Sequence, residues 1–346
     1  MFRRVLLACA VAALVSNGCG GSGNGTETGT DNGTDTGADT GADAVDSTTA
    51  DAAPQDIPGE DLTPEPPPDP SAKGTIASTH ASYTLSWTES GTEVQLPLEL
   101  DVPDPAGSYP VIVFSHGFGA EPRMYKSYGE LLASHGYVTV MPQYPASFTN
   151  PVPHVTLAAY LAKILDWIEA NGAAAESPLK GRADTTRIGL SGHSMGGKIS
   201  LLLAASDKRP KAAFLVDPVD AAGGPGAGPT AEYPSVTPEL MPQIMIPLGL
   251  LGETVNGTGE PMGCAPAEDN FHQYWLYAAG PALEIEVIGA NHTDFMDAED
   301  CGIACLFCPA GTADQKTTHT ITQKYLVAFY NVHLLQKKAY LPYLDG

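Results

Sequence analysis

The stretch that decides the fold is RIGLSGHSMGGKIS, residues 187–200, in which a short apolar run turns through glycines into a helix-compatible segment. Gly192 and Gly196 flank Ser194 with the spacing GxSxG, where missing side chains let a strand and a helix approach closely. Such a turn strains the backbone of the serine and raises its hydroxyl above a sheet. It also places the backbone N–H of Met195 at a helix N-terminus, where partial positive charge can stabilise an oxyanion. The stretch predicts a nucleophilic Ser194, although the bare pattern also occurs in ordinary turns.

On both sides of this turn, strand-like apolar runs alternate with amphipathic helical segments, as a mostly parallel sheet covered on both faces requires. The run Val111–Phe114 is continuously apolar, which is typical of a central strand buried on both faces. Strands are predicted at 84–88, 93–100, 111–114, 137–144, 187–191, 211–219, 244–252 and 283–289, and helices at 124–134, 154–170, 199–205 and 320–339. The first two strands form an antiparallel hairpin. This order predicts one α/β-hydrolase domain with a single mostly parallel sheet and helices on both faces.

A serine hydroxyl becomes an effective nucleophile when a histidine accepts its proton, and that histidine needs a carboxylate to fix its tautomer. His292 lies in IGANHTDFMD, directly after the last predicted strand, where this fold presents its base. His272 is a competing base, but it lies in an acidic segment before a helix and not at the end of a strand. We therefore predict His292 as the general base.

Two carboxylates compete for the role of the acid that orients the histidine. Asp217 ends the strand KAAFLVD, and Glu253 ends the next strand in LLGET. Both positions lie at the carboxyl edge of the sheet, where catalytic groups gather in open α/β sheets. The residues favour Asp217, with Glu253 as the alternative. Asp220 and Asp294 are interpreted as turn or capping residues.

The loop HGFG after the strand 111–114 supplies glycines for close approach to a substrate, and the backbone N–H of Phe118 is the predicted second oxyanion donor beside that of Met195. His116 is predicted to support this loop through hydrogen bonds, and His193 to pack beside the turn. Phe118, Met195 and Tyr144 would make an apolar mouth, although apolar residues at strand ends are more often core.

The segment 220–242 is rich in Gly and Pro and has no periodicity. It is either a lid on the substrate side or a long surface connection.

The first residues have the features of an export signal. Residues 1–18 contain two arginines and an apolar run too short to span a membrane, followed by small residues. Cys19 follows Ser-Asn-Gly in an imperfect lipobox and is the predicted lipidation site, with ordinary signal cleavage as the alternative. Cys9 also follows apolar residues, but the apolar stretch before it is too short. The chain is therefore expected to be exported, as a bacterial cell-envelope lipoprotein held by this anchor or else as a secreted protein.

Residues 19–72 form a predicted disordered tether, which leaves 73–346 as the catalytic domain. From residue 20 to 72 the chain has twelve acidic residues and no Lys or Arg, too little apolar surface to offset the entropy of ordering. Its evenly spaced aspartates could bind calcium, but the apolar pattern of calcium-binding β-rolls is missing. The formal net charge of −23 excludes nucleic acid as a partner and leaves neutral or cationic substrates.

Four cysteines lie in the last third of the chain: Cys264, Cys301, Cys305 and Cys308. In an exported protein two disulfides are expected, and three pairings are possible. The predicted pairs are Cys264 with Cys301 and Cys305 with Cys308. The spacing CxxxCxxC could also hold a metal or an iron–sulfur cluster, but a fourth ligand at zinc-ribbon spacing is missing and the expected compartment is oxidising. Disulfides are therefore expected here and not a metal or iron–sulfur site.

Several stretches together resemble the chlorophyllase branch of the α/β hydrolases, with a looser similarity to bacterial polyester hydrolases and cutinases. These stretches are PVIVFSHGF, LASHGYVTVMPQ, GHSMGGK, VDPVD, GCAPAEDNFHQYW, NHTDFMDAED and CLFC, together with the terminal helix. In that family the aspartate of the DPV motif is the acid of the triad, which supports Asp217 over Glu253. The resemblance carries Ser194 over as nucleophile and His292 as base, and it implies ester hydrolysis through an acyl-enzyme without a cofactor.

Two departures concern the substrate. Plant chlorophyllases typically have arginine after the serine, whereas Met195 resembles the lipase and polyester-hydrolase version. An exported, tethered protein would also rarely meet chlorophyll inside a plastid. The expected function is therefore an exported serine esterase acting on an apolar-acyl ester or a polyester. The alternatives are an amidase, peptidase or acyltransferase with the same triad, and a non-catalytic surface-binding protein that keeps the fold.

Overall fold

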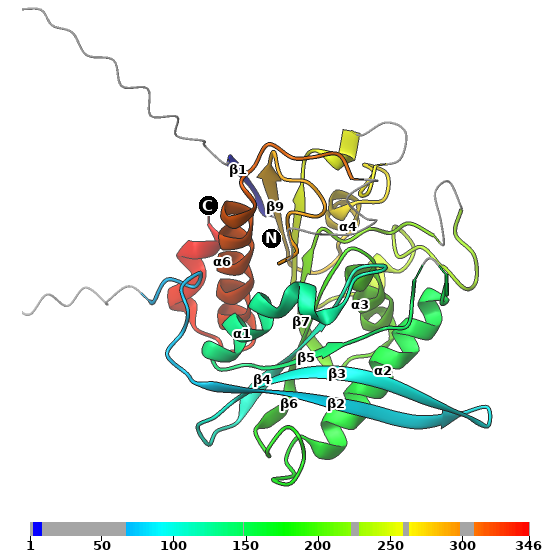
Figure 1. Cartoon of the computed structure of the whole chain (residues 1–346). Helices are drawn as coiled ribbons and strands as arrows, with labels where there is room; N and C mark the ends of the chain where they lie inside the picture. The colour runs from blue at the N-terminus through cyan, green and yellow to red at the C-terminus, as the bar shows by residue number, and fades with distance from the viewer. Residues whose placement is uncertain are drawn as a thin grey trace, which may run out of the picture. The chain divides into compact units, whose positions relative to one another are not determined.

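The computed structural model describes residues 3–8, 67–147, 149–222, 228–258, 263–297 and 308–345 (Figure 1). Its strands are β1 (Arg3–Ala8), β2 (Ser78–Glu89), β3 (Thr92–Pro103), β4 (Tyr109–Ser115), β5 (Val138–Pro142), β6 (Ala183–His193), β7 (Pro210–Val216), β8 (Leu248–Glu253) and β9 (Ala282–Ile288). Its α-helices are α1 (Lys126–Ser134), α2 (His154–Asn171), α3 (Met195–Ser206), α4 (Phe271–Leu276) and α6 (Gln315–His333). Short 3-10 turns are η1 (Pro122–Tyr125), η2 (Met241–Gln243), η3 (Asn256–Thr258) and η4 (Lys338–Leu344).

The strands form one sheet in the order β1-β9-β8-β7-β6-β4-β5-β3-β2. Pairing is parallel from β1 to β5 along this order, and only β3 pairs antiparallel with both β5 and β2. The carboxyl ends of β4, β6, β7, β8 and β9 therefore lie along one edge. This arrangement confirms the predicted α/β-hydrolase fold with its opening antiparallel hairpin.

The sheet is buried on both faces because its central strands alternate their side chains between two apolar layers. In β4, Val111 and Val113 belong to the core cluster that includes α2 and α3, whereas Ile112 and Phe114 belong to the cluster that includes α1 and α6. Figure 1 shows the two helix pairs on opposite sides of the sheet. All four side chains are at most 1% exposed, and burying each stabilises the fold by roughly 1.5–3 kcal/mol.

The predicted helix boundaries hold at α2 but not at the last helix. The expected helix 320–339 begins earlier, at Gln315, because the side chain of Asp314 accepts a hydrogen bond from the Thr317 N–H and caps the first turn. It ends at His333, ahead of Gln336, whose φ of 58° is incompatible with a continuing helix. The later residues 338–344 form the separate turn η4.

The edge strand β1 comes from the segment that was predicted to be an export signal. It pairs in parallel with β9 and with no other strand in the described part of the sheet. The other eight strands therefore form a continuous sheet without β1. The export signal stays a prediction. Most of the predicted tether, residues 19–66, lies outside the described residues. No described helix is both long and apolar enough to cross a membrane.

Candidate active site

Ser194 lies on a sharp turn between β6 and α3, and its φ of 55° and ψ of −123° confirm the predicted strained backbone. The turn requires glycine on both sides. A Cβ on Gly196 would lie 2.0 Å from the carbonyl oxygen of Ser115, and one on Gly192 would lie 2.6 Å from the carbonyl carbon of Gly196. Met195 begins the twelve-residue helix α3, so its N–H lies at the positive end of the helix dipole.

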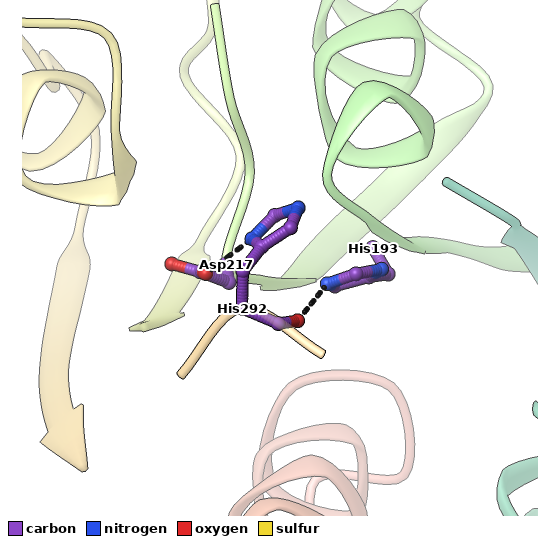
Figure 2. A group of neighbouring side chains, drawn as sticks. All are labelled: His193, Asp217 and His292. Carbon is purple, nitrogen blue, oxygen red and sulfur yellow. Dashed lines mark hydrogen bonds and ion pairs between the residues drawn. The ribbon is translucent and has the colours of Figure 1, made fainter. Parts of the chain in front are cut away.

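Asp217 and His292 are joined at the carboxyl edge of the sheet (Figure 2). Asp217 follows β7, and its Oδ2 lies 2.6 Å from Nδ1 of His292, which is in the loop after β9. The carboxylate is fully buried, whereas His292 is 8% exposed. The aspartate has a φ of 44°, a conformation that few non-glycine residues adopt, and its N–H donates to the carbonyl of Leu251 at 2.5 Å. The backbone is thus bent to aim this carboxylate at the histidine ring.

Glu253, the alternative acid, makes different contacts. Its Oε2 accepts hydrogen bonds from the backbone N–H groups of Val255 and Asn256, the latter at 2.8 Å, and its Oε1 is buried without a hydrogen-bond partner. Burial, with the nearby charge of Asp217, raises the pKa of Glu253 to about 9. Glu253 is therefore a neutral acid at pH 7 that organises its own loop, and the histidine contact belongs to Asp217.

The raised pKa of Glu253 makes stability depend on pH. Between the pKa near 4.5 of the unfolded chain and the pKa of about 9 in the folded protein, only the folded state holds this proton. The resulting stabilisation of the folded state is therefore complete below the unfolded pKa and is lost as the pH rises towards the folded pKa. Glutamine has the shape of the protonated acid and does not titrate. We expect the free energy of unfolding of Glu253→Gln, measured by urea denaturation, to increase relative to that of the wild type as the pH rises from 5 to 9. A difference that stays constant over this range would contradict the assignment.

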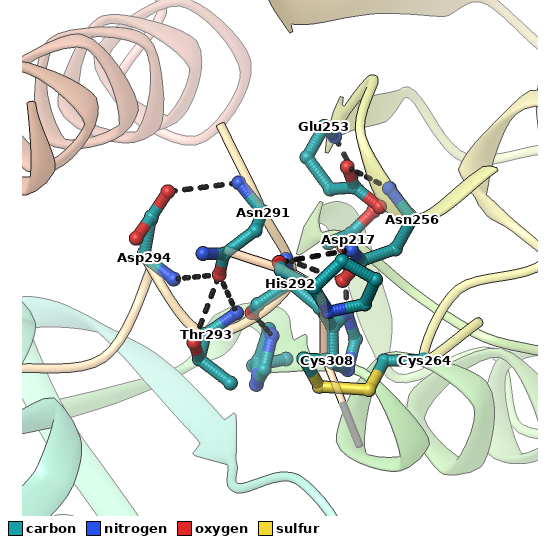
Figure 3. Close-up of a disulfide and its surroundings, with 11 residues drawn as sticks. Asp217, Glu253, Asn256, Cys264, Asn291, His292, Thr293, Asp294 and Cys308 are labelled. Atoms are coloured by element: carbon teal, nitrogen blue, oxygen red, sulfur yellow. Dashed lines mark hydrogen bonds and ion pairs between the residues drawn. A yellow bond between two sulfur atoms is a disulfide. The ribbon is translucent and has the colours of Figure 1, made fainter. Parts of the chain in front are cut away.

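The backbone of His292 is held on two further sides (Figure 3). Its N–H donates to Oδ1 of Asn256 at 3.0 Å. Its carbonyl oxygen lies 2.9 Å from Nε2 of His193, a bond drawn in Figure 2. Asn256 is fully buried and also donates from Nδ2 to the carbonyl of Pro309 at 3.4 Å. It therefore ties the loop after β8 to the loop that carries His292. Sequence reasoning missed Asn256, because a lone asparagine before a glycine is typical of an ordinary turn.

His116 sets the direction of the loop after β4. Its Nδ1 lies 2.7 Å from the carbonyl oxygen of Gly117, and its Nε2 accepts from the N–H of Tyr144 at 2.9 Å. Burial lowers the pKa of His116 to about 4, so the ring is neutral and donates through Nδ1. In a trans peptide the N–H points opposite to the carbonyl, so this bond turns the N–H of Phe118 away from His116. The predicted supporting role of His116 is confirmed.

Ser194, His292 and the Phe118 loop line one hollow that is partly open to solvent. Its apolar lining includes Phe118, Ala120, Met124 and Met296. The Phe118 side chain is 37% exposed, so it lies at the rim. Tyr144, by contrast, is 3% exposed and packs in the core, so it does not extend the mouth as predicted.

His193, Asp217 and His292 each present an atom that could bind a metal, and these atoms lie within 4.8 Å of one another. Both ring nitrogens of His193, however, already have partners: Nδ1 is 2.8 Å from the Tyr125 hydroxyl, and Nε2 faces the His292 carbonyl. Nδ1 of His292 is bonded to Asp217. The arrangement therefore fits a hydrogen-bonded network better than a metal centre.

Two further candidate residues, His272 and Asp294, make structural contacts. His272 lies within α4, not ahead of it, and pairs with the buried Glu284 at 2.5 Å. Asp294 accepts from the N–H of Asn291 at 2.8 Å, which confirms its interpretation as a turn residue.

Asp220 is also structural, but its contacts exceed those of a simple cap. Its carboxylate lies 3.3 Å from the fully buried Nζ of Lys198 and accepts from the N–H groups of Val236 and Thr237 at 3.0 and 2.8 Å. Asp220 thus ties the start of the segment 220–242 to Lys198 of α3 and to residues 236 and 237 of the same segment. Residues 223–227 lie outside the described part.

The cysteine pairing differs from the prediction. Cys264 bonds to Cys308, 44 residues later, beside the loop of His292 (Figure 3). The predicted pair of Cys264 with Cys301 is therefore wrong, as is that of Cys305 with Cys308. Spacing could not choose among the three pairings, because a disulfide requires two cysteines whose Cα atoms lie close in space, here 5.3 Å, and sequence spacing does not give that distance. Cys301 and Cys305 lie outside the described residues. As disulfide members, Cys264 and Cys308 cannot ligate a metal.

Comparison with known proteins adds a family to this geometry. A family model described as Chlorophyllase matches residues 72–344. Chlorophyllase-2 of Arabidopsis thaliana is 28% identical over 211 residues, which cover 57% of this chain and 64% of the relative. Chlorophyllase-1 of the same plant is 26% identical over 70% of this chain and 78% of its own length, and Chlorophyllase-1, chloroplastic, of Citrus unshiu is 23% identical over 67% and 71%. With its α/β-hydrolase sheet and a family match over most of its length, the chain belongs to the chlorophyllase family.

Proposed function

We propose that this protein hydrolyses carboxylic esters through Ser194, His292 and Asp217. The observation that carries the proposal is the 2.6 Å contact between Asp217 and His292, which share a sheet edge with the strained turn at Ser194. Ser194 and His292 line the same hollow. Membership of a hydrolase family supports the same chemistry.

In the proposed reaction Oγ of Ser194 attacks the ester carbonyl carbon while Nε2 of His292 takes the hydroxyl proton. Asp217 holds the ring so that Nδ1 carries a proton and the imidazolium is stabilised. The N–H groups of Phe118 and Met195 bind the oxyanion. The His292 proton then passes to the departing alcohol, leaving an acyl-serine. Water, deprotonated by the same histidine, attacks the acyl carbon and releases the acid and the free serine.

The substrate we propose is an ester with an apolar group beside the scissile bond. Apolar side chains of Met124 and Met296 line the hollow, and methionine adapts to irregular shapes. The named relatives are chlorophyllases, but Met195 stands where plant chlorophyllases typically have arginine. An apolar-acyl ester or a polyester therefore suits the site at least as well as chlorophyll.

Active-site labelling tests the proposal. We expect a fluorophosphonate to modify the folded full-length chain once, with the adduct on the tryptic peptide that contains Ser194. Heat-denatured protein is the control, because an unactivated serine does not react. Absence of labelling in folded protein that retains its native circular dichroism would overturn the proposal and favour a binding role.

We also propose that the protein is exported, with Cys19 as its lipid-attachment site. The arginines and apolar run of residues 1–18 support export. The Cys264–Cys308 disulfide supports it independently, since such bonds persist in oxidising compartments. Metabolic labelling with a palmitate analogue, compared between wild type and Cys19→Ala, distinguishes an anchored from a freely secreted product.

A further inference from the structure

A buried chain of hydrogen bonds links the loop of the proposed oxyanion donor to the proposed base. The N–H of Gly117 lies 3.3 Å from the Tyr125 hydroxyl, this hydroxyl lies 2.8 Å from Nδ1 of His193, and Nε2 of His193 lies 2.9 Å from the carbonyl oxygen of His292. Tyr125 is fully buried and His193 is 3% exposed. Figure 2 shows the last of these bonds. The chain spans three segments far apart in sequence.

The direction of every bond in this chain is determined. The His292 carbonyl can only accept, so Nε2 of His193 must carry the proton. Burial, and then the neighbouring His292, hold the pKa of His193 well below its usual range, so the ring is neutral and Nδ1 is an acceptor. The Tyr125 hydroxyl must therefore donate to Nδ1, and its oxygen can accept from the Gly117 N–H. The His292 carbonyl thus sets the tautomer of His193, and the tyrosine supplies the hydrogen bond that the buried Nδ1 needs in that tautomer.

The base is then held from three directions. Asp217 binds Nδ1 of the His292 ring, Asn256 binds the His292 N–H, and His193 binds the carbonyl. Among these three contacts, only that of His193 connects the base to the oxyanion loop. A Cβ on Gly117 would lie 3.1 Å from Nδ1 of His193, so the close approach of the loop depends on this glycine.

We propose that Tyr125 is a positioning residue that, through its hydrogen bond to Nδ1 of His193, sets the distance between the general base and the oxyanion loop. The inference rests on the proposed function of Ser194 and His292. Tyr125 contacts neither of these side chains in the described hydrogen-bond network. Its effect is on how well two catalytic elements are aligned, and small misalignments reduce rate steeply.

Tyr125→Phe removes the hydroxyl and keeps the ring. We expect kcat on a p-nitrophenyl ester to fall about tenfold with KM changed less than about twofold, because alignment and not substrate contact is lost. The matched control is Tyr330→Phe. Tyr330 is equally buried, and its hydroxyl likewise bridges two groups, donating to the Leu190 carbonyl at 2.5 Å and accepting from the Phe214 N–H at 3.1 Å. The control should lower the melting temperature similarly and leave kcat unchanged.

Substitutions of His193 provide a rescue test. His193→Gln keeps an N–H that can reach the His292 carbonyl, whereas His193→Leu keeps none. We expect the glutamine variant to retain at least about fivefold more kcat than the leucine variant at similar melting temperatures. Equal kcat values for the two variants would show that His193 acts by packing alone and would overturn the inference.

Nuclear magnetic resonance of ¹⁵N-histidine-labelled protein tests the mechanism without any substrate. The His193 signals, assigned by their loss in His193→Gln, should show a proton on Nε2 in the wild type and in Tyr125→Phe, with the Nδ1 resonance shifted in Tyr125→Phe because that nitrogen has lost its hydrogen-bond donor. A proton on Nδ1 in the wild type would overturn the inference, as would a Tyr125→Phe kcat equal to that of Tyr330→Phe. If Ser194 fails to label and no ester is hydrolysed, the proposed function fails, while the shift of the His193 Nδ1 resonance in Tyr125→Phe still decides whether Tyr125 holds this ring.

Discussion

Ser194→Ala is expected to remove ester hydrolysis almost completely, with kcat lowered by a factor on the order of 10⁴ or more. The reason is chemical: alanine has no hydroxyl to form the acyl-enzyme, so only uncatalysed attack by water, helped by the oxyanion donors, is left. Folding should be intact, because alanine adopts the φ of 55° at this position about as well as serine does. The measurement is the initial rate on a p-nitrophenyl ester at equal protein concentration, with circular dichroism and thermal unfolding in parallel.

Ser206→Ala is the matched control for this variant. Ser206 ends the same helix α3, and its hydroxyl donates only a long bond of 3.4 Å to the Leu203 carbonyl. We expect its kcat to equal that of the wild type. Residual activity of Ser194→Ala above about one per cent of the wild type would contradict the assignment of the nucleophile. Loss of activity together with a lower melting temperature would instead indicate damage to the fold.

The turn at Ser194 could be predicted from sequence because its constraints are local. Gly192 and Gly196 are required by contacts within a few residues of the serine and by one neighbouring strand, and the glycines are visible in the sequence. The alternating burial of β4 is equally local, since period-2 side-chain direction follows from strand geometry. The fold and the strained turn at Ser194 could therefore be predicted from the sequence.

The acid could not be chosen from local pattern alone, because Asp217 and Glu253 end adjacent parallel strands. The two acids differ in their three-dimensional contacts. The backbone of Asp217, with its φ of 44°, directs the carboxylate at His292. The carboxyl group of Glu253 instead accepts hydrogen bonds from two backbone N–H groups of the loop that follows it. For the same reason, the contacts of Tyr125 and Asn256 could not be predicted from the sequence. Their partners are 68 and 36 residues away, and neither lies in a recognisable pattern.

Exchange of the two acids gives the sharpest test of the site. Asp217→Asn is expected to lower kcat by about 10⁴-fold, as loss of the orienting carboxylate does in serine hydrolases that use a triad. Asparagine keeps the shape but can donate to Nδ1 of His292, which favours the tautomer whose Nε2 carries the proton and cannot accept one from Ser194. Glu253→Gln is expected to lower kcat less than tenfold at pH 7, because glutamine copies a carboxyl that already holds its proton.

Glu253 should not replace the missing charge in Asp217→Asn. Burial, the larger cause of its raised pKa, persists after the nearby aspartate charge is removed, so the pKa of Glu253 stays raised. Its carboxyl oxygen also remains bonded to the Val255 and Asn256 N–H groups, away from the His292 ring. The two variants therefore distinguish the two acids. A larger loss of kcat in Glu253→Gln than in Asp217→Asn would assign the role of the acid to Glu253. The expected result, a larger loss in Asp217→Asn, assigns the charge that stabilises the imidazolium to Asp217.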